Sequence, residues 1–472
     1  MRIRAGVLSV LAVLTTAATA FAQDWSFDAR DIAMGGVGTT GNLATKMIAE
    51  QRDYTSIVLP FGLIQVFKDM SIYNPDSKSF DPVRALEYAA SPMHYALDRG
   101  TTNSAEELFV SDLRNATISR DLSRYKGFVP ANDVLAEGLA APNFGGTIKL
   151  YKGARGSFQG IYVGAGPYLS VRSDSTFDPG LTGVLATGIN VPNAQFPITT
   201  QDQGQVALAI TGGYRGRFAW GPGIGSGSER EGLYVAANYN FLRGFQYESD
   251  AMSIALQTDA SGLLVNASNI VIDHLHSSDG RGYSLDFGIG AVVDRWEVGF
   301  GANGVGNHID WSGLEQTRYT LPSLMSGNSN FITTPVVGAG DARVELPVDY
   351  RANVAYYANR WAAAGEVGHG FGGASLHAGL ERRYGPFAVR GGARYSFSKW
   401  NPTAGVGFDL SPRVALDVAA YGTNANIEQT RDAVIAASIR INHLKSGPNR
   451  SPKEKLEGQN ESERGTSAAL SR

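Results

Sequence analysis

The sequence predicts an all-β protein, a transmembrane antiparallel β-barrel of about 14 strands with an N-terminal plug-like segment and a helical extracellular insertion. Three observations predict this fold class. From Phe144 onward, apolar and polar residues alternate with a period of two. Long and short connections between the alternating segments follow each other in turn, and aromatic residues come directly after the tightest turns.

Residues 1–22 have the pattern of a secretory signal peptide. The basic start Met1-Arg2-Ile3-Arg4 precedes an apolar run from Ala5 to Ala20, and Ala20-Phe21-Ala22 supplies the small-x-small pattern that signal peptidase reads. The mature chain would therefore begin at Gln23 and be exported. We expect it to be an integral protein of the bacterial outer membrane.

Composition favours one large barrel over two or three soluble domains. The chain has 472 residues with 57 Gly and no Cys, and after the signal peptide no apolar run has the length of about 18 residues that a membrane-crossing helix needs. Without disulfides, an exported chain of this size is stabilised by its buried area alone. Because the net charge is −3, the sequence predicts no nucleic-acid partner.

The segment 23–55 contains Gly36-Val37-Gly38-Thr39-Thr40-Gly41, which has the spacing of a dinucleotide-binding loop. Such a loop follows an apolar strand, whereas Trp25 to Met34 is polar and charged, so no cofactor is predicted. We interpret the segment as a plug that enters or closes the periplasmic mouth, its glycines letting the backbone approach a glycine-lined wall. A flexible leader is the alternative. The plug residues would be Met34, Gly35, Gly36 and Gly38.

The barrel itself is expected to span residues 56–443. Trp296, Val298 and Phe300, for example, lie on one face of a strand and alternate with Glu297 and Gly299 on the other. Strands are expected at about 56–67, 145–152, 157–172, 204–219, 231–247, 281–293, 296–309, 345–358, 361–369, 374–383, 386–396, 402–410, 413–421 and 432–443.

Every second connection between these strands is short. The short ones are 153–156, 220–230, 294–295, 359–360, 384–385 and 411–412, and the long ones include 68–144, 173–203, 248–280 and 310–344. Outer-membrane barrels place long loops outside the cell and short turns in the periplasm, so an even number of strands puts both termini in the periplasm. Trp296, Trp361 and Phe387 are first outward residues after tight turns, as expected for an aromatic girdle at the lipid headgroups.

The long connection 68–144 is the expected helical insertion. Asp81-Pro82 would begin a helix that runs to Ala90, with Asp as the N-cap and Pro at the first helical position. The helix could form a lid over the extracellular mouth. Alternatively, its apolar Leu86, Tyr88 and the nearby Met93 are the buried side of an ordinary ordered loop.

Several charged residues are expected to point into the lumen of the barrel. Glu366 and His377 would face each other across a hairpin, and Glu381 would lie diagonal to Arg390, with Arg394 on the same strand. Such side chains could bind and sort solutes. They could equally be charges that pair inside the barrel to keep it folded.

The chain also carries a histidine pair and lacks common hydrolase motifs. His274 and His276 share a face of an extended segment and would need Asp273 or Asp279 to bind zinc, but no third strong ligand is evident, so no metal is predicted. Neither G-x-S-x-G nor H-E-x-x-H occurs, and we expect no enzyme activity.

The start of the mature chain resembles a known family. Phe27-Asp28-Ala29-Arg30 followed by Ile32-Ala33-Met34-Gly35-Gly36-Val37-Gly38 is similar to the "ARS-x-x-MGGAG" start in the superfamily of FadL-like hydrophobic-compound transporters, PorV-like proteins and plasmid-transfer TraF-like outer-membrane proteins. The FadL-like resemblance implies a fourteen-stranded barrel whose N-terminal hatch blocks the lumen, with hydrophobic ligands passing from an extracellular groove.

Residues 444–472 form a polar, charged tail that has too little apolar surface to order itself and is expected to be disordered in the periplasm. Two functions follow as hypotheses. The first is a transporter or channel for small solutes, hydrophobic ones on the FadL-like resemblance, gated by the plug. The second is a closed barrel that acts through its loops as a secretion, conjugation or assembly partner. The expected partners are outer-membrane lipid and a small-molecule solute, with a periplasmic or secretion-system protein in the second case.

Overall fold

The fold was analysed in a computed structural model of the chain. It describes residues 28–37, 42–50, 54–59, 61, 73–74, 79–80, 94–97, 104–141, 143–226, 228–265, 270–327, 330–370, 373–396, 399–423 and 431–442. The signal peptide, Gly38, the helix expected at 81–90 and the tail at 444–472 lie outside these residues. In the described part of the chain, no helix combines the length and the apolar character that crossing a membrane requires.

The main body of the fold is a 20-stranded antiparallel sheet. Each expected strand is present in it, as β1 (Tyr54–Leu59), β6 (Phe144–Lys152), β7 (Phe158–Phe177), β8 (Gln195–Phe218), β9 (Gly232–Gln257), β11 (Asp279–Val293), β12 (Trp296–Ser312), β16 (Asp349–Tyr357), β17 (Trp361–Gly370), β18 (Gly373–Tyr384), β19 (Phe387–Ser396), β20 (Lys399–Asp409), β21 (Val414–Thr423) and β22 (Asp432–Asn442).

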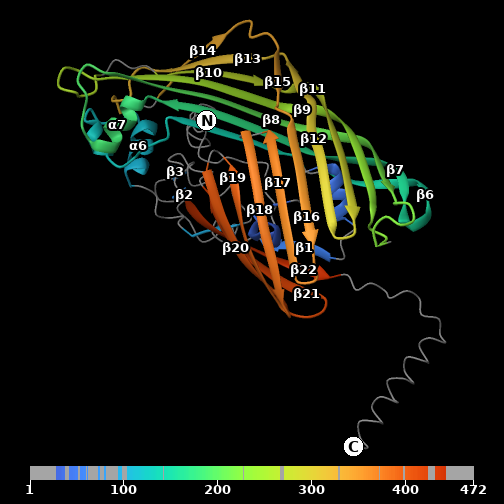
Figure 1. Cartoon of the computed structure of the whole chain (residues 1–472). Helices are drawn as coiled ribbons and strands as arrows, with labels where there is room; N and C mark the ends of the chain where they lie inside the picture. The colour runs from blue at the N-terminus through green and yellow to red at the C-terminus, as the bar shows by residue number, and fades with distance from the viewer. Residues whose placement is uncertain are drawn as a thin grey trace, which may run out of the picture.

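These strands pair in sequence order from β6 to β9, then through β11, β12 and β16 to β22. The first strand, β1, pairs with the last, β22, and sets Tyr54 opposite Asn442. The sheet curves around two short N-terminal helices, drawn in blue in Figure 1: α2 (Ala29–Ala33) and α3 (Leu43–Ala49). The expected all-β antiparallel architecture is therefore confirmed.

The expected alternation of short and long connections is also present. Two-residue turns join β11 to β12 and β18 to β19, whereas the opposite ends of β7, β9 and β12 lead into further helices and strands. The aromatic residues Trp296, Trp361 and Phe387 begin their strands and are exposed to 51%, 45% and 50%. They therefore point away from the protein at the short-turn end, as an aromatic girdle would.

The long connections differ from the expectation, because three strands extend far beyond the predicted ends. The structure extends β7 to Phe177, starts β8 at Gln195 and extends β9 to Gln257, so parts of the expected loops 173–203 and 248–280 are strand. The expected loop 310–344 likewise contains further strands. The first part of β8, residues 195–203, was not predicted as strand because Pro197 and polar residues such as Thr200 interrupt the apolar pattern that marks a strand.

The extended strands build what we call the outer subdomain. The end of β7 pairs with β5 (Asp133–Ala140), and the end of β9 pairs with β10 (Ile270–Ser277). Next to β10 the sheet continues with β13 (Glu315–Leu321) and then β14 (Ile332–Val336). The helices α6 (Ser104–Arg114), η2 (Leu122–Tyr125) and α7 (Pro179–Thr187) lie against this sheet (Figure 1). Their common apolar core includes Phe109, Tyr125, Leu181, Ile254 and Ile272.

Helix α7 shows why a helix forms at this place. Asp178 caps it by accepting hydrogen bonds from the N–H groups of Gly180 and Leu181, Pro179 occupies the first turn, and Gly188 ends it in the left-handed region at φ 72°. The remaining short elements are β2 (Tyr73–Asn74), β3 (Ser79–Phe80), β4 (Tyr95–Ala96), β15 (Ala342–Glu345) and η3 (Ala154–Gly156).

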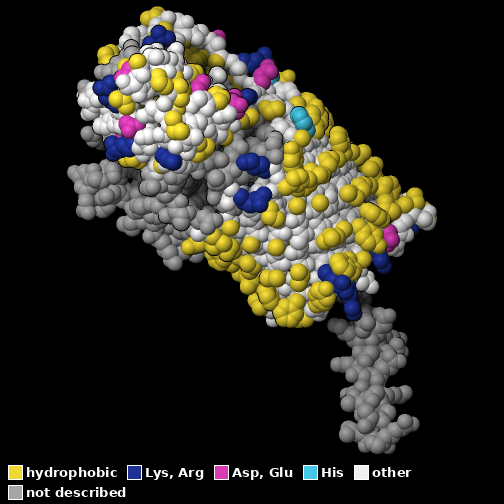
Figure 2. Space-filling view, turned by 60° about the vertical axis from the view of Figure 1, so that its left-hand side comes forward, with side chains coloured by type: hydrophobic (Ala, Val, Ile, Leu, Met, Phe, Trp, Pro, Cys, Tyr) yellow, Lys and Arg dark blue, Asp and Glu magenta, His cyan; other side chains and the backbone are white. Residues whose placement is uncertain are grey.

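The main sheet reverses the usual distribution of polar and apolar side chains. Its outer face carries exposed apolar residues such as Phe300, 52% exposed, and Leu380, 55% exposed. Its inner face carries buried charges such as Arg390 and Glu381, each 3% exposed. Figure 2 shows the apolar side chains spread over the strands in a broad band. A sheet with this distribution is suited to a lipid environment, in which exposed apolar groups cost nothing and polar groups must be satisfied inside.

Arginine in place of Leu380 tests this distribution. In lipid vesicles we expect the Leu380→Arg variant to lose about 2–4 kcal/mol of unfolding free energy, because an outward charge in the middle of a strand would enter hydrocarbon. Denaturant titration in vesicles measures it. The control is Val337→Arg, since Val337 is 97% exposed and lies beyond the end of β14. Equal stability of both variants would contradict a lipid-facing outer surface.

Candidate functional site

The candidate site is the contact between the N-terminal segment and the inner face of the sheet. Helix α2 begins at Asp28, whose side chain accepts from the N–H of Arg30, and the chain then turns at Gly35 and Gly36 with φ 83° and 81°. Glycine adopts these left-handed angles without strain. Helix α3 begins at Asn42, whose side-chain oxygen accepts from Thr45 N–H at 2.9 Å.

The turn after α2 lies directly against glycines of β18 and β19. A Cβ atom on Gly379 would collide with the backbone of Met34, and one on Gly392 would lie 2.6 Å from the backbone nitrogen of Gly35. On β20, a Cβ on Gly405 would lie 2.5 Å from the Cβ of Ala33. The backbone of the segment approaches the wall this closely only because these positions have no side chains.

Helix α3 makes the same kind of contact with β11 and β12. A Cβ on Gly288 would lie 2.6 Å from the nitrogen of Ala44, and one on Gly301 would collide with the side chain of Asn42. The apolar side of α3, which includes Met47, packs into a cluster with residues of the surrounding strands: Phe158, Tyr234, Ala236 and Val292. The two helices therefore contact different parts of the wall.

His377 bonds to the N-terminal segment. It lies opposite Glu366 in the register of β17 and β18, as expected, but its Nδ1 donates to the carbonyl oxygen of Gly35 at 2.6 Å. Glu366 accepts instead from Arg351 at 3.0 Å. Thr403 adds a further contact, since its Oγ1 accepts from Gly35 N–H at 3.1 Å.

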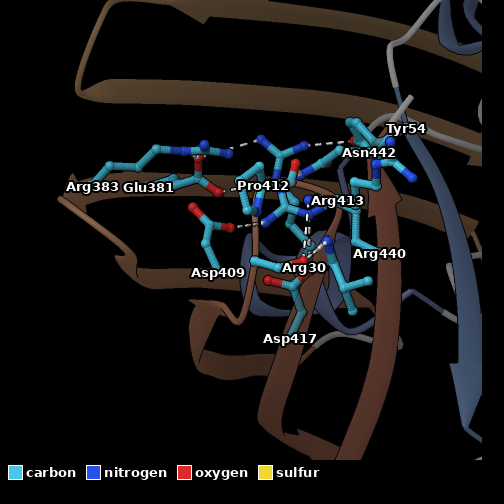
Figure 3. A network of polar contacts seen from close by, with 12 residues as sticks. Arg30, Tyr54, Glu381, Arg383, Asp409, Pro412, Arg413, Asp417, Arg440 and Asn442 are labelled. Atoms are coloured by element: carbon cyan, nitrogen blue, oxygen red, sulfur yellow. Dashed lines mark hydrogen bonds and ion pairs between the residues drawn. The ribbon is translucent and has the colours of Figure 1, made fainter. Parts of the chain in front are cut away.

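Glu381 is the centre of a buried ion-pair cluster. Its carboxylate lies 2.9 Å from Nε of Arg30 and 2.9 Å from Nε of Arg383 (Figure 3). It also lies 2.6 Å from Nε of Arg390. Arg390 lies directly opposite Glu381 in the register, which corrects the expected diagonal placement. Of these partners, Arg30 belongs to α2, so the cluster joins the N-terminal segment to the sheet.

Asp417 and Arg440 extend the cluster across β21 and β22. The Arg390 Nη1 lies 2.7 Å from Asp417, which also lies 3.4 Å from Nε of Arg440. The hydroxyl of Tyr54, on β1, accepts from Arg30 at 2.6 Å. These partners were not predicted, because Asp417, Arg440 and Tyr54 belong to strands that only the closing pairs β21–β22 and β22–β1 bring next to one another.

Two further predicted residues are Arg394 and Gly36. Arg394 does not join the cluster: it donates to the carbonyl oxygen of Gly422 at 3.4 Å, and its guanidinium lies 5.1 Å from the ring centre of Tyr421. Gly36, expected in the plug, is partly buried at the turn after α2.

The histidine pair belongs to the outer subdomain. His274 Nδ1 lies 2.8 Å from Asp250, whereas Asp273 pairs with Arg318 and Asp279 with Arg243. Over the described ranges, no group of three or more His, Cys, Asp or Glu side chains is arranged to hold a metal ion.

Neither a family model nor a curated protein matches the chain. Among solved structures it is similar to the TodX ΔS2S3 mutant monoaromatic hydrocarbon channel, at 14% identity and a TM-score of 0.30, covering 66% of this chain and 91% of that one. It is also similar to the Ralstonia pickettii toluene transporter TbuX, at 10% identity and a TM-score of 0.31, covering 66% of this chain and 87% of that one. A Pseudomonas aeruginosa FadL homologue matches at 9% identity and a TM-score of 0.32, covering 66% of this chain and 89% of that one. These proteins belong to the group that the N-terminal motif resembles.

Proposed function

We propose that the protein is an outer-membrane β-barrel that passes small solutes and whose lumen is gated by residues 28–50, the N-terminal plug. The observation that carries the proposal is the reversed side-chain distribution of the main sheet, with exposed Leu380 outside and buried Arg390 inside. In lipid, such a sheet must close on itself, because an open edge would leave backbone groups without hydrogen bonds.

The contacts of the plug support its role as a gate. Helix α2 is held by polar groups, chiefly the ion pair of Arg30 with Glu381 and the hydrogen bond from His377 to Gly35. Helix α3 is held by apolar packing of residues such as Met47. A segment fixed at two separate places by side chains, and covalently joined to β1 by a few residues, can block the lumen and still be released without unfolding the barrel.

Hydrophobic solutes are proposed on the resemblance of the N-terminal motif. Toluene and a neutral sugar are suitable probes of this choice. Uptake of toluene by reconstituted vesicles without uptake of the sugar would support a hydrophobic-compound transporter. Equal uptake of both would instead indicate a general channel.

A disulfide between the plug and the wall tests the gate. A Cβ on Gly290 would lie 3.2 Å from the Cβ of Ala44, close to the separation of about 3.5–4.5 Å found in disulfides, and the chain has no other cysteine. We expect the Ala44→Cys/Gly290→Cys variant to cross-link on oxidation. Solute flux into liposomes should then fall to the level of protein-free vesicles and recover on reduction.

The matched control is Ala44→Cys/Gly391→Cys, since no atom lies within 4 Å of a Cβ at Gly391, outside the barrel. This pair should not cross-link. Flux that is the same in the oxidised and reduced protein would end the gating proposal. A failure to cross-link would show that the plug does not lie against Gly290.

The outer subdomain favours a second candidate, a closed barrel that binds a secretion or assembly partner. The buried core among its described residues, which includes Ile254, gives it a defined folded surface rather than a set of loops. A sealed barrel that shows no flux even after release of the plug, and that co-purifies with a stoichiometric protein, would favour this second function.

A further inference from the structure

A row of polar side chains crosses the sheet of the outer subdomain. Ser173 of β7 lies opposite Asp202 of β8, Asp202 opposite Asp250 of β9, and Asp250 opposite His274 of β10. Residues that are directly opposite in an antiparallel sheet share one face, with Cβ atoms about 4.5–5.5 Å apart. Two carboxyl groups are therefore neighbours on this face.

Both carboxyl groups are buried, and one of them is poorly satisfied. Asp202 is 5% exposed and Asp250 4%. Asp250 bonds to His274 at 2.8 Å, whereas in the described ranges the Asp202 oxygens make no hydrogen bond of good geometry, and the Ser173 hydroxyl is only a weak donor to them. An ionised carboxylate in such a place would carry a large desolvation cost and would repel its neighbour as well.

The surrounding charges increase this cost. Burial is the largest cause that raises the pKa of Asp202, to about 8; the Ser173 hydroxyl lowers this pKa, and the negative charges of Asp250 and Asp174 raise it further. The hydrogen bond to Asp250 raises the pKa of His274, and Glu248 acts on it in the same direction. Helix α7, which packs over this sheet, has no charged residue that could compensate.

The row lies at the junction between the barrel and the outer subdomain. On β8, Gln205 and Asp202 are both buried although they are three residues apart, so the buried face of the strand changes between them. Beyond the row, Ile198 and Ile254 belong to the core under the helices. Charge in the row would therefore act at the base of that core.

We propose that Asp202 holds a proton beside the Asp250 carboxyl group in the folded protein, and that loss of this proton loosens the packing of the outer subdomain on the barrel. The subdomain is then a pH-sensitive element: closely packed in acid and more easily opened toward neutral and alkaline pH. This inference does not depend on solute passage or on the plug.

The sign follows from the direction of the shift. The folded Asp202 keeps a proton that the opened state releases above its ordinary pKa of 3.8, so stability is fully present below that value and is lost as the pH rises to about 8. The raised pKa of His274 also makes stability fall as the pH rises, but only above the ordinary histidine pKa of 6.5. Between pH 5.0 and 6.5, the expected loss of stability of the outer subdomain is therefore due to Asp202.

Hydrogen exchange on the full chain in detergent tests the proposal. Amide protection, corrected for the intrinsic effect of pH, is followed in peptides from α7 and from residues 195–205. We expect protection in the wild type to fall at least about tenfold from pH 5.0 to 6.5, since one proton gives up to tenfold per pH unit. In Asp202→Asn, which is neutral at both pH values, the fall should be less than about threefold.

Glu315→Gln is the matched control, because Glu315 is an exposed acid of the same subdomain, on β13, and lies outside the row, so this variant should behave as the wild type. If Asp202→Asn fails to fold, Asp202→Leu replaces it with the same expectation. Equal protection of the wild type at both pH values, or an unchanged pH effect in the Asp202 variant, would overturn the proposal. The proposal would also be overturned if calcium chloride restored amide protection at pH 6.5 and a chelator removed it again. That result would indicate that the carboxylates bind a cation.

Discussion

The Glu381→Gln variant is expected to lose about 3–5 kcal/mol of unfolding free energy, the usual cost of breaking a buried ion pair by removing one partner. Glu381 is 3% exposed and accepts from Arg30, Arg383 and Arg390. The neutral amide would leave three guanidinium groups close together without the carboxylate they share. The midpoint of denaturant unfolding in lipid vesicles, read by heat-modifiable migration on a gel, measures the loss.

Asp310→Asn provides the matched control. Asp310 pairs with Arg343 at 3.4 Å, but the two side chains are 60% and 54% exposed, and exposed pairs contribute little to stability. The double variant Arg30→Gln/Glu381→Gln should lose less than the sum of the two single variants, because each change removes the partner of the other. Wild-type stability of Glu381→Gln would show that the cluster does not hold the fold.

The second large effect is expected from leucine at Gly379. A Cβ at this position collides with the backbone of Met34, so a leucine must displace the N-terminal segment. Overpacking costs about 1–3 kcal/mol, which increases opening of the segment about fivefold to 150-fold. Arg30 is 7% exposed, so trypsin reaches it only when the segment opens. Trypsin cleavage after Arg30, followed by mass spectrometry on reconstituted protein, should accelerate by the same factor.

Gly391→Leu is the control for this variant, because no atom lies within 4 Å of a Cβ at Gly391 and the position faces outward. Its cleavage rate should equal that of the wild type. If both leucine variants are cleaved equally, or if neither is cleaved faster than the wild type, the segment does not lie against Gly379 in the membrane-embedded protein.

The strands of the main sheet could be predicted because their signal is local. On β12, Trp296, Val298 and Phe300 alternate with residues of the inner face, and this period of two can be read directly along the chain. The far parts of β8 and β9 could not be predicted in this way. Their buried face carries Thr200 and Asp202 as well as Ile198, so the segment looks like a polar loop until the helices cover it.

The candidate site divides in the same way. Glu366 and His377 were expected to be opposite because a hairpin fixes the register of neighbouring strands, and the structure agrees. The actual partners of their side chains, Arg351 for Glu366 and the Gly35 carbonyl for His377, could not be read from the hairpin. The hydrogen-bond partner of a buried side chain depends on all the elements that pack against the inner face.

Local patterns along the chain predict the antiparallel strands, the division into a short-turn end and a long-connection end, and the glycine-rich character of both the N-terminal segment and the inner wall. The pairing of Arg30 with Glu381, 351 residues away, and the burial of Asp202 beside Asp250 become visible only in the folded protein. The two kinds of feature differ in range, because alternation repeats every two residues, whereas these contacts exist only after the curved sheet has brought distant strands and the N-terminal helices together.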